Sequence, residues 1–199
     1  MEYACLGVAV ALQTLLEHYS RPGRVPQVFD ERLYPLCGPN SPLGVVSFVW
    51  SENHPLLGKP RGCMSFDYAL CVVSRLEMTH KELVLAYAIV EQLINTQPSA
   101  VQAHSLRPIF LIASVVATKV TLDEPHSIAA SFMKLRDVFT TTSVPLLVVM
   151  ERQLLVLLQW HLPTGNIHQD CACPLACPRC FPRLADAPRP NLTPRSPLS

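Results

Sequence analysis

Apolar residues recur at every third or fourth position along most of the chain, and this spacing is typical of amphipathic α-helices. The first such stretch runs from Cys5 to Tyr19 and ends at the turn-forming sequence Ser20-Arg21-Pro22-Gly23. Five further stretches follow within residues 65–160, separated by short polar segments. The pattern therefore predicts an all-α protein.

Capping residues define where several of these helices begin. Ser65 is a good N-cap for a helix from Phe66 to Leu76, and Thr79 with Glu82 has the spacing of a capping box that opens a helix to about Asn95. Proline in the first turn and polar N-caps predict the starts of later helices. The three later helices are expected from Leu106 to about Leu122, from Ser127 to Phe139, and from the Thr140–Ser143 cap to Trp160, with Pro145 in the first turn.

The helix from Leu106 to about Leu122 is apolar on almost every side. Ile109, Ile112 and Val116 lie on one stripe, and Phe110 widens it. Such a helix is expected in the centre of the fold, wrapped by its neighbours. The fold prediction is a five-helix bundle around this central apolar helix, with an extra N-terminal helix before it.

Proline content divides the chain. Residues 21–62 contain too many prolines for a long helix, so an irregular, partly extended insertion is expected there. The residues from 164 onward are again rich in proline and poor in apolar residues, which predicts disorder. The expected organisation is an N-terminal helix at 1–20, a Pro-rich insertion at 21–62, a helical domain at 63–163, and a Cys/Pro-rich tail at 164–199.

Composition restricts the classes of function. The chain has 199 residues, of which 49% are hydrophobic, enough for one substantial core. A net charge of +1, with sixteen scattered Lys and Arg, offers no concentrated basic face for nucleic acid. The seven histidines are spread singly, and no Gly-rich phosphate loop or nucleophile motif is present. We therefore expect neither a nucleic-acid-binding protein nor an enzyme, and no cofactor.

The long apolar stretches are interrupted before they reach the roughly 20 residues that a membrane span needs. Arg107 and Lys119 bracket one stretch, and the N-terminal run lacks the basic start of a signal peptide because Glu2 stands there. Four of the eight cysteines are scattered through the first part of the chain, which fits reduced thiols better than a disulfide scaffold. We expect no membrane segment and an intracellular protein, cytoplasmic, nuclear or both.

The other four cysteines are crowded into the tail. Cys171, Cys173, Cys177 and Cys180 end in a C-x2-C spacing, and four thiolates suit tetrahedral zinc. Zinc sites usually place a longer loop between the two ligand pairs than this segment offers. A reduced tail without metal is the favoured interpretation, and a metal-dependent interaction module is the alternative.

Glu151 stands out because its helix offers it no partner. The positions three and four residues away, where a pairing side chain would lie on a helix, are all apolar: Leu147, Val148, Leu154 and Leu155. A carboxylate on a buried surface without a partner costs several kcal/mol or protonates. A cation from another helix or another protein is therefore expected, and Lys119 is the best internal candidate.

Several segments of the helical domain resemble one known family in order and spacing. They are Met64–Tyr68, Ala86–Ile94, Leu106–Lys119, and Met150–Leu155 followed by Leu158–Leu162 with its Trp-x-Leu sequence. Together they resemble the cyclin box, and specifically the single-box, phosphate-pathway type of cyclin found in fungi and protists. The resemblance covers about half of the chain.

This resemblance implies a function. In cyclins the corresponding lysine and glutamate hold the regulatory C-helix of a cyclin-dependent kinase, so Lys119 and Glu151 are the expected kinase-binding residues. The chain would be a regulatory subunit that forms a heterodimer with the kinase and activates it in a cell-cycle or nutrient context. The alternative is a cyclin-fold scaffold or adaptor that does not stimulate a kinase.

Overall fold

The computed structural model describes residues 1–38, 66–121 and 128–163 of the chain. All regular elements in these ranges are helical, which confirms the prediction of an all-α protein. The six α-helices and one short 3-10 helix are α1 (Glu2–Tyr19), η1 (Gln27–Phe29), α3 (Phe66–Leu76), α4 (His80–Thr96), α5 (Leu106–Thr121), α6 (Ile128–Leu135) and α7 (Val144–Leu157).

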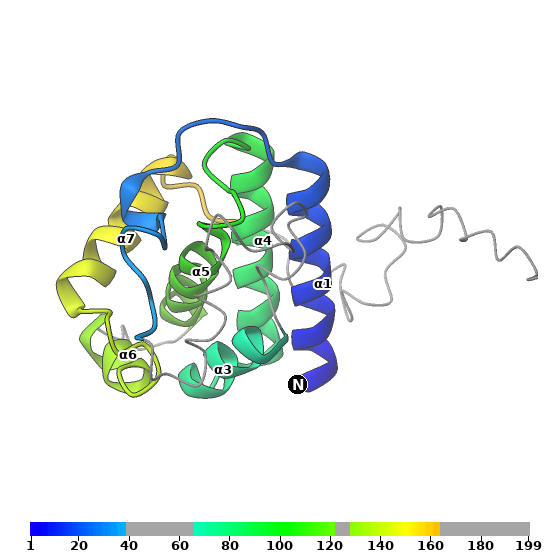
Figure 1. The fold of residues 1–199 in the computed structure, drawn as a ribbon. Coiled ribbons are helices and arrows are strands. Elements are labelled where there is room, and N and C mark those ends of the chain that lie inside the picture. The colour runs from blue at the N-terminus through cyan, green and yellow to red at the C-terminus, as the bar shows by residue number, and fades with distance from the viewer. Residues whose placement is uncertain (39–65, 122–127, 164–199) are drawn as a thin grey trace, which may run out of the picture.

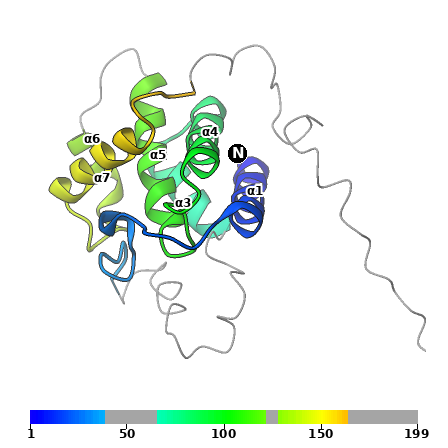
Figure 2. The ribbon, with the colours of Figure 1, turned by 90° about the horizontal axis from the view of Figure 1, so that it is seen from above.

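Helix α5 lies in the middle of the fold, with α4 and α1 on one side and α6 and α7 on the other (Figures 1 and 2). Every residue from Leu106 to Thr118 is buried. The sequence predicted this position from the apolar character of the helix on all sides, and the prediction is confirmed. Burial of a complete helix surface requires neighbours all around it, which the other helices supply.

The local signals place most helix boundaries within a residue or two. Thr79 and Glu82 form the predicted capping box, with the Thr79 N–H donating to Glu82 at 2.5 Å and the Glu82 N–H donating to the Thr79 hydroxyl at 3.4 Å. Ser143 caps α7 by accepting from the Leu146 N–H at 3.4 Å. These contacts satisfy backbone donors that the first turn of a helix leaves unpaired.

One helix is shorter than predicted, because α6 ends at Leu135 and not at Phe139. The chain continues in turns, and Phe139 is buried with its ring packed edge-on against Tyr68 at 5.9 Å between centroids. After Leu135 and Arg136 the chain continues with an aspartate, a valine, a phenylalanine and three threonines, none of which strongly favours helix. Packing of Phe139 into the core therefore decides the conformation there.

The described part of the expected insertion, residues 21–38, runs from the end of α1 across the molecule to the start of α7 (Figure 1). We call these residues the strap. It is irregular apart from η1, as predicted, but it also contributes Phe29, Leu36 and Cys37 to the buried core. The Glu31 N–H donates to the His104 carbonyl at 3.0 Å, and the Gly38 N–H donates to the Thr140 hydroxyl at 3.1 Å. The strap is thus an integral part of the helical domain.

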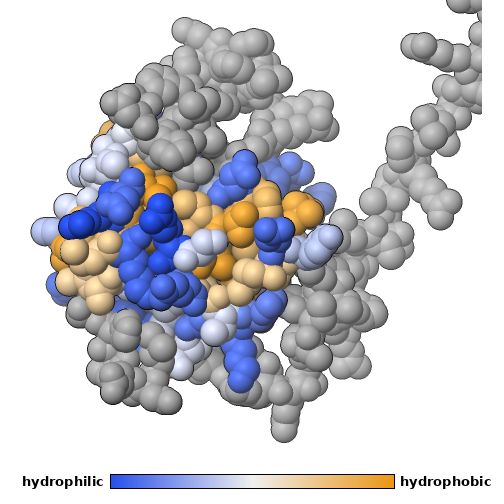
Figure 3. Space-filling view, turned by 90° about the horizontal axis from the view of Figure 1, so that it is seen from below, coloured by the Kyte–Doolittle hydropathy of each residue, from blue (hydrophilic) through white to orange (hydrophobic). Residues whose placement is uncertain are grey.

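Polar and apolar residues are unevenly distributed over the surface. Seen from below, polar residues gather in the middle of the face, with apolar residues on both sides of them (Figure 3). An exposed ion pair joins α6 to the turn after α3, where Lys134 Nζ lies 2.5 Å from a carboxylate oxygen of Glu77. Among the described helices, none is both long enough and apolar enough to cross a membrane.

Several expectations fall outside the described residues. These are the N-cap role of Ser65, the helix start at Ser127, the remainder of the insertion at 39–62, and the Cys/Pro-rich tail at 164–199, which holds the four candidate zinc ligands Cys171, Cys173, Cys177 and Cys180. Their predicted properties stay predictions.

Candidate functional site

Lys119 and Glu151 meet at the junction of α5 and α7. Lys119 lies in the last turn of α5 and Glu151 lies in the middle of α7. The Lys119 Nζ atom is 2.5 Å from Glu151 Oε1, and the two side chains are 27% and 17% exposed. The cation that the sequence required for Glu151 is therefore supplied by Lys119 within the same chain.

Apolar side chains surround this pair on α7 and at the end of α5. Leu147 and Leu154 are buried beneath Glu151, whereas Val148 is 44% exposed and Leu155 is partly buried. Beside Lys119, Val120 is 43% exposed. We call Lys119, Glu151, Val120, Val148 and Leu155 the pair face.

The pair face combines charge with exposed apolar surface. Partial burial strengthens a charge-assisted hydrogen bond, because less water competes for it. Within the part of the chain that the structure describes, neither charged group has a second hydrogen-bond partner. Among the described residues, the second carboxylate oxygen and the other ammonium protons are therefore not bonded, and apolar side chains lie around them.

A second charged pair, which the sequence analysis did not predict, lies at the opposite end of α5. Arg107 Nη1 is 3.4 Å from Glu31 Oε1, and both side chains are only 1% exposed. The Arg107 guanidinium lies 4.5 Å from the centroid of the Tyr68 ring, and the Tyr68 hydroxyl donates to the Arg107 carbonyl at 2.8 Å. Burial raises the pKa of Glu31, and the charge of Arg107 opposes this rise.

The sequence indicated that Arg107 needs a buried partner, but it did not identify that partner. An arginine in the first turn of an otherwise apolar, central helix must meet a carboxylate or pay a large desolvation cost. The sequence does not say which carboxylate, because Glu31 lies in the irregular strap, where no periodicity fixes its direction. The pair joins α5 to the strap inside the core, and because it is buried it offers no surface for a ligand.

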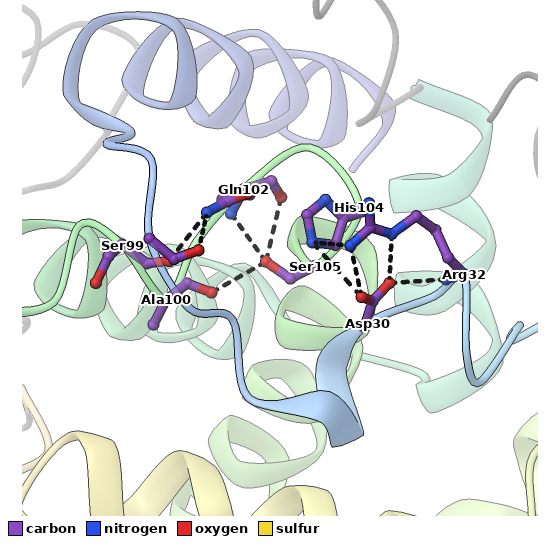
Figure 4. Close-up of polar contacts among 8 residues, drawn as sticks. Asp30, Arg32, Ser99, Ala100, Gln102, His104 and Ser105 are labelled. Atoms are coloured by element: carbon purple, nitrogen blue, oxygen red, sulfur yellow. Dashed lines mark hydrogen bonds and ion pairs between the residues drawn. The ribbon is translucent and has the colours of Figure 1, made fainter. Parts of the chain in front are cut away.

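A third polar cluster fastens the strap to the loop before α5 (Figure 4). The Arg32 guanidinium donates to both carboxylate oxygens of Asp30, at 2.9 and 2.7 Å, and its Nη2 atom lies 3.3 Å from His104 Nε2. His104 Nε2 is 3.9 Å from Asp30 Oδ2. Burial lowers the pKa of His104, as does the nearby charge of Arg32, while Asp30 opposes the change.

The same loop contains a serine close to this histidine, but the two do not form a catalytic arrangement. The Ser105 hydroxyl is buried and donates to the Ala100 carbonyl at 3.1 Å, while the Gln102 N–H donates to the hydroxyl at 2.8 Å. Gln102 also donates through its side-chain amide to the Gly23 carbonyl of the strap at 2.9 Å. The loop therefore serves as an anchor for the strap.

In the ranges 1–38, 66–121 and 128–163, no three His, Cys, Asp or Glu residues are placed to hold one metal ion. The described cysteines Cys5, Cys37 and Cys71 are not joined in disulfides with one another.

Comparison with known proteins found no match: no protein-family model, no curated protein and no solved structure matches the sequence.

Proposed function

We propose that this chain is a cyclin-like regulatory subunit that binds and activates a cyclin-dependent protein kinase through the pair face. The observation that carries the proposal is the Lys119–Glu151 contact of 2.5 Å at the junction of two helices, where both side chains stay partly exposed. These are the two residues that the resemblance to cyclins assigns to kinase binding. Their contact places both residues at one point of the surface, where a single docked helix could reach them.

The chemistry of the pair face suits a docked helix. A cation and a carboxylate that lie side by side offer donors and acceptors to backbone or side-chain groups of a partner. Val148 and Val120, which are 44% and 43% exposed, add apolar area at the same place. Interfaces of this type concentrate most of their binding energy in a few central residues.

Activation would follow by population shift. A kinase samples active and inactive arrangements of its regulatory helix, and a subunit that binds the active arrangement more tightly raises its population. No chemical step is required of the chain itself.

The proposal is tested by co-purification of the full chain with a panel of cyclin-dependent kinases. Lys119→Ala and Glu151→Ala should each reduce kinase recovery and kinase activity by tenfold or more, with circular dichroism showing that both variants fold. Lys134→Ala is the matched control, because Lys134 forms an ion pair of the same length, 2.5 Å, on a more exposed part of the surface. Equal losses in the control, or no kinase recovered with the wild type, would reject the proposal.

A second candidate function is favoured by one observation. Lys119 and Glu151 satisfy each other in the free chain, so neither needs a kinase to compensate its charge. A cyclin-fold scaffold or adaptor could keep this pair for stability alone. In that case the two alanine variants would lower the stability of the free protein but leave partner binding unchanged.

A further inference from the structure

A buried carboxylate on α4 reaches the last turn of α5, the same turn that carries Lys119. Glu82 is 6% exposed and its carboxylate accepts two hydrogen bonds, one from the Thr79 N–H at 2.5 Å and one from the Thr121 hydroxyl at 2.9 Å. The first belongs to the capping box. The second is an additional contact between two helices, because Thr121 is the final residue of α5. The Thr121 hydroxyl also lies 3.0 Å from the Ala117 carbonyl and 3.3 Å from the Thr118 carbonyl of its own helix, so the Glu82 carboxylate is the nearest of three acceptors for its one proton.

The two contacts of the last α5 turn point in different directions. Successive residues on a helix are about 100° apart, so positions 119 and 121 are separated by about 200° around the axis. Thr121 therefore bonds to α4 on one side of the helix, while Lys119 bonds to α7 on the other. The turn is held between two carboxylates, Glu82 and Glu151.

Helix ends need such contacts to keep their position. The last turn of a helix has carbonyl groups without intrahelical partners, and it frays readily. The reach of a lysine side chain is long, so its ammonium group is only as well placed as the backbone that carries it and the partner that it meets.

We infer that Glu82 and Thr121 are positioning residues for the Lys119–Glu151 site: the Thr121–Glu82 bond fixes the last turn of α5 and thereby the Lys119 ammonium. This inference rests on the proposed function where it concerns kinase binding. The positioning itself concerns the free protein and is measurable there.

Four single variants separate positioning from general stability. Thr121→Val keeps the shape of the side chain and removes the hydroxyl, and Thr121→Ser keeps the hydroxyl and should rescue the effect. Thr118→Val is the control for loss of a bond within α5: among the described residues the Thr118 hydroxyl bonds to the Val115 carbonyl of its own helix at 2.9 Å, a contact of the kind that Thr121 also makes to the Ala117 carbonyl at 3.0 Å. Glu82→Gln should reproduce the loss seen in Thr121→Val, with an added loss of stability because the capping box is weakened.

The first readout is the ¹H–¹⁵N NMR signal of the Lys119 ammonium in the free protein, which is observable when a bonded, partly buried ammonium exchanges protons slowly. We expect this signal in the wild type, in Thr121→Ser and in Thr118→Val, and its loss in Thr121→Val. A signal unchanged in Thr121→Val, or absent from the wild type, would overturn the inference. Equal loss in Thr118→Val would do so as well, because loss of a threonine bond within α5 would then be enough to cause the effect.

The second readout is affinity for the kinase that co-purifies with the wild-type chain. Thr121→Val should weaken binding about tenfold, and Thr121→Ser and Thr118→Val should not. If Lys119→Ala abolishes kinase binding but Thr121→Val leaves it unchanged, the positioning role fails and the proposed function stands. If no kinase binds the wild type, the proposed function fails, and the NMR signal alone decides whether Thr121 positions Lys119.

Discussion

The buried Arg107–Glu31 pair gives the sharpest prediction about stability, because its two halves should respond differently to removal. The side chains are 1% exposed and 3.4 Å apart, and Glu31 Oε1 and Oε2 as well as Arg107 Nε and Nη1 lack a hydrogen-bond partner within the described residues. Such a pair gains little from its attraction, while each charge would be costly alone. The perturbations are Arg107→Met, Glu31→Leu and the double variant.

Arg107→Met leaves a carboxylate that can escape its burial by protonation. The ordinary pKa of Glu31 is 4.5 and burial raises it. Neutralising such a group at pH 7 costs at most 2.5 pH units at 1.36 kcal/mol each, or about 3.4 kcal/mol. A carboxyl group with a raised pKa binds its proton more tightly when folded, so this cost falls as the pH is lowered and vanishes near pH 4.5.

Glu31→Leu leaves a guanidinium that cannot lose its proton. Its cost should therefore be independent of pH between 4.5 and 7, at about 3 to 5 kcal/mol. The contact with the Tyr68 ring, 4.5 Å away, offsets part of this cost. At pH 7 the double variant removes both charges and should cost less than either single variant.

The assay is urea unfolding followed by circular dichroism, with each variant compared with the wild type at pH 4.5, 5.5 and 7. Comparison at each pH cancels the titration of other groups. A pH-independent cost for Arg107→Met, or a double variant as unstable as the sum of the two single variants, would refute the account of the pair.

Three further outcomes are expected. Lys119→Ala should destabilise the free protein more than the Lys119→Ala/Glu151→Ala double variant, by about 0.5 to 1 kcal/mol in urea unfolding, because the single change leaves Glu151 partly buried and unpaired; equal stabilities would contradict this. The lowered pKa of His104 means that the folded protein favours the neutral imidazole ring. The stability that this ring contributes to folding is therefore present above pH 6.5, the ordinary pKa of histidine, and is lost as the pH falls below that value. His104→Asn should flatten the stability profile of the protein between pH 7 and 5, and an unchanged profile would argue against the role of this ring. Phe29→Ala should cost about 3 to 5 kcal/mol, as expected for a fully buried aromatic residue; a loss under 1 kcal/mol would show that the strap is dispensable.

Much of the fold was predictable because its signals are local. The capping box of Thr79 and Glu82, the proline in the first turn of α7 and the apolar surface of α5 each depend on residues a few positions apart. Glu151 was equally informative, since four apolar neighbours on its own helix required a cation from elsewhere. That cation is Lys119.

The contributions of the strap were not predictable in the same way. The prolines of the strap predicted that it would form no long helix. They did not indicate that Phe29 and Leu36 would be buried, because an irregular segment has no periodicity that separates inward-facing from outward-facing residues. The early end of α6 has a related cause. Phe139 gains more from packing against Tyr68 than from continuing a helix through residues that favour it weakly.

By itself, the sequence determined the helical class, most helix boundaries, the central place of α5 and the need of Glu151 for a partner. These features follow from hydrogen bonds and apolar faces that repeat over a few residues. Only the tertiary structure decided that Arg107 meets Glu31 and that Glu82 reaches Thr121 as well as its own cap. Such contacts join residues far apart in the chain, and their formation depends on how packed helices and the strap cross in space, which local spacing does not specify.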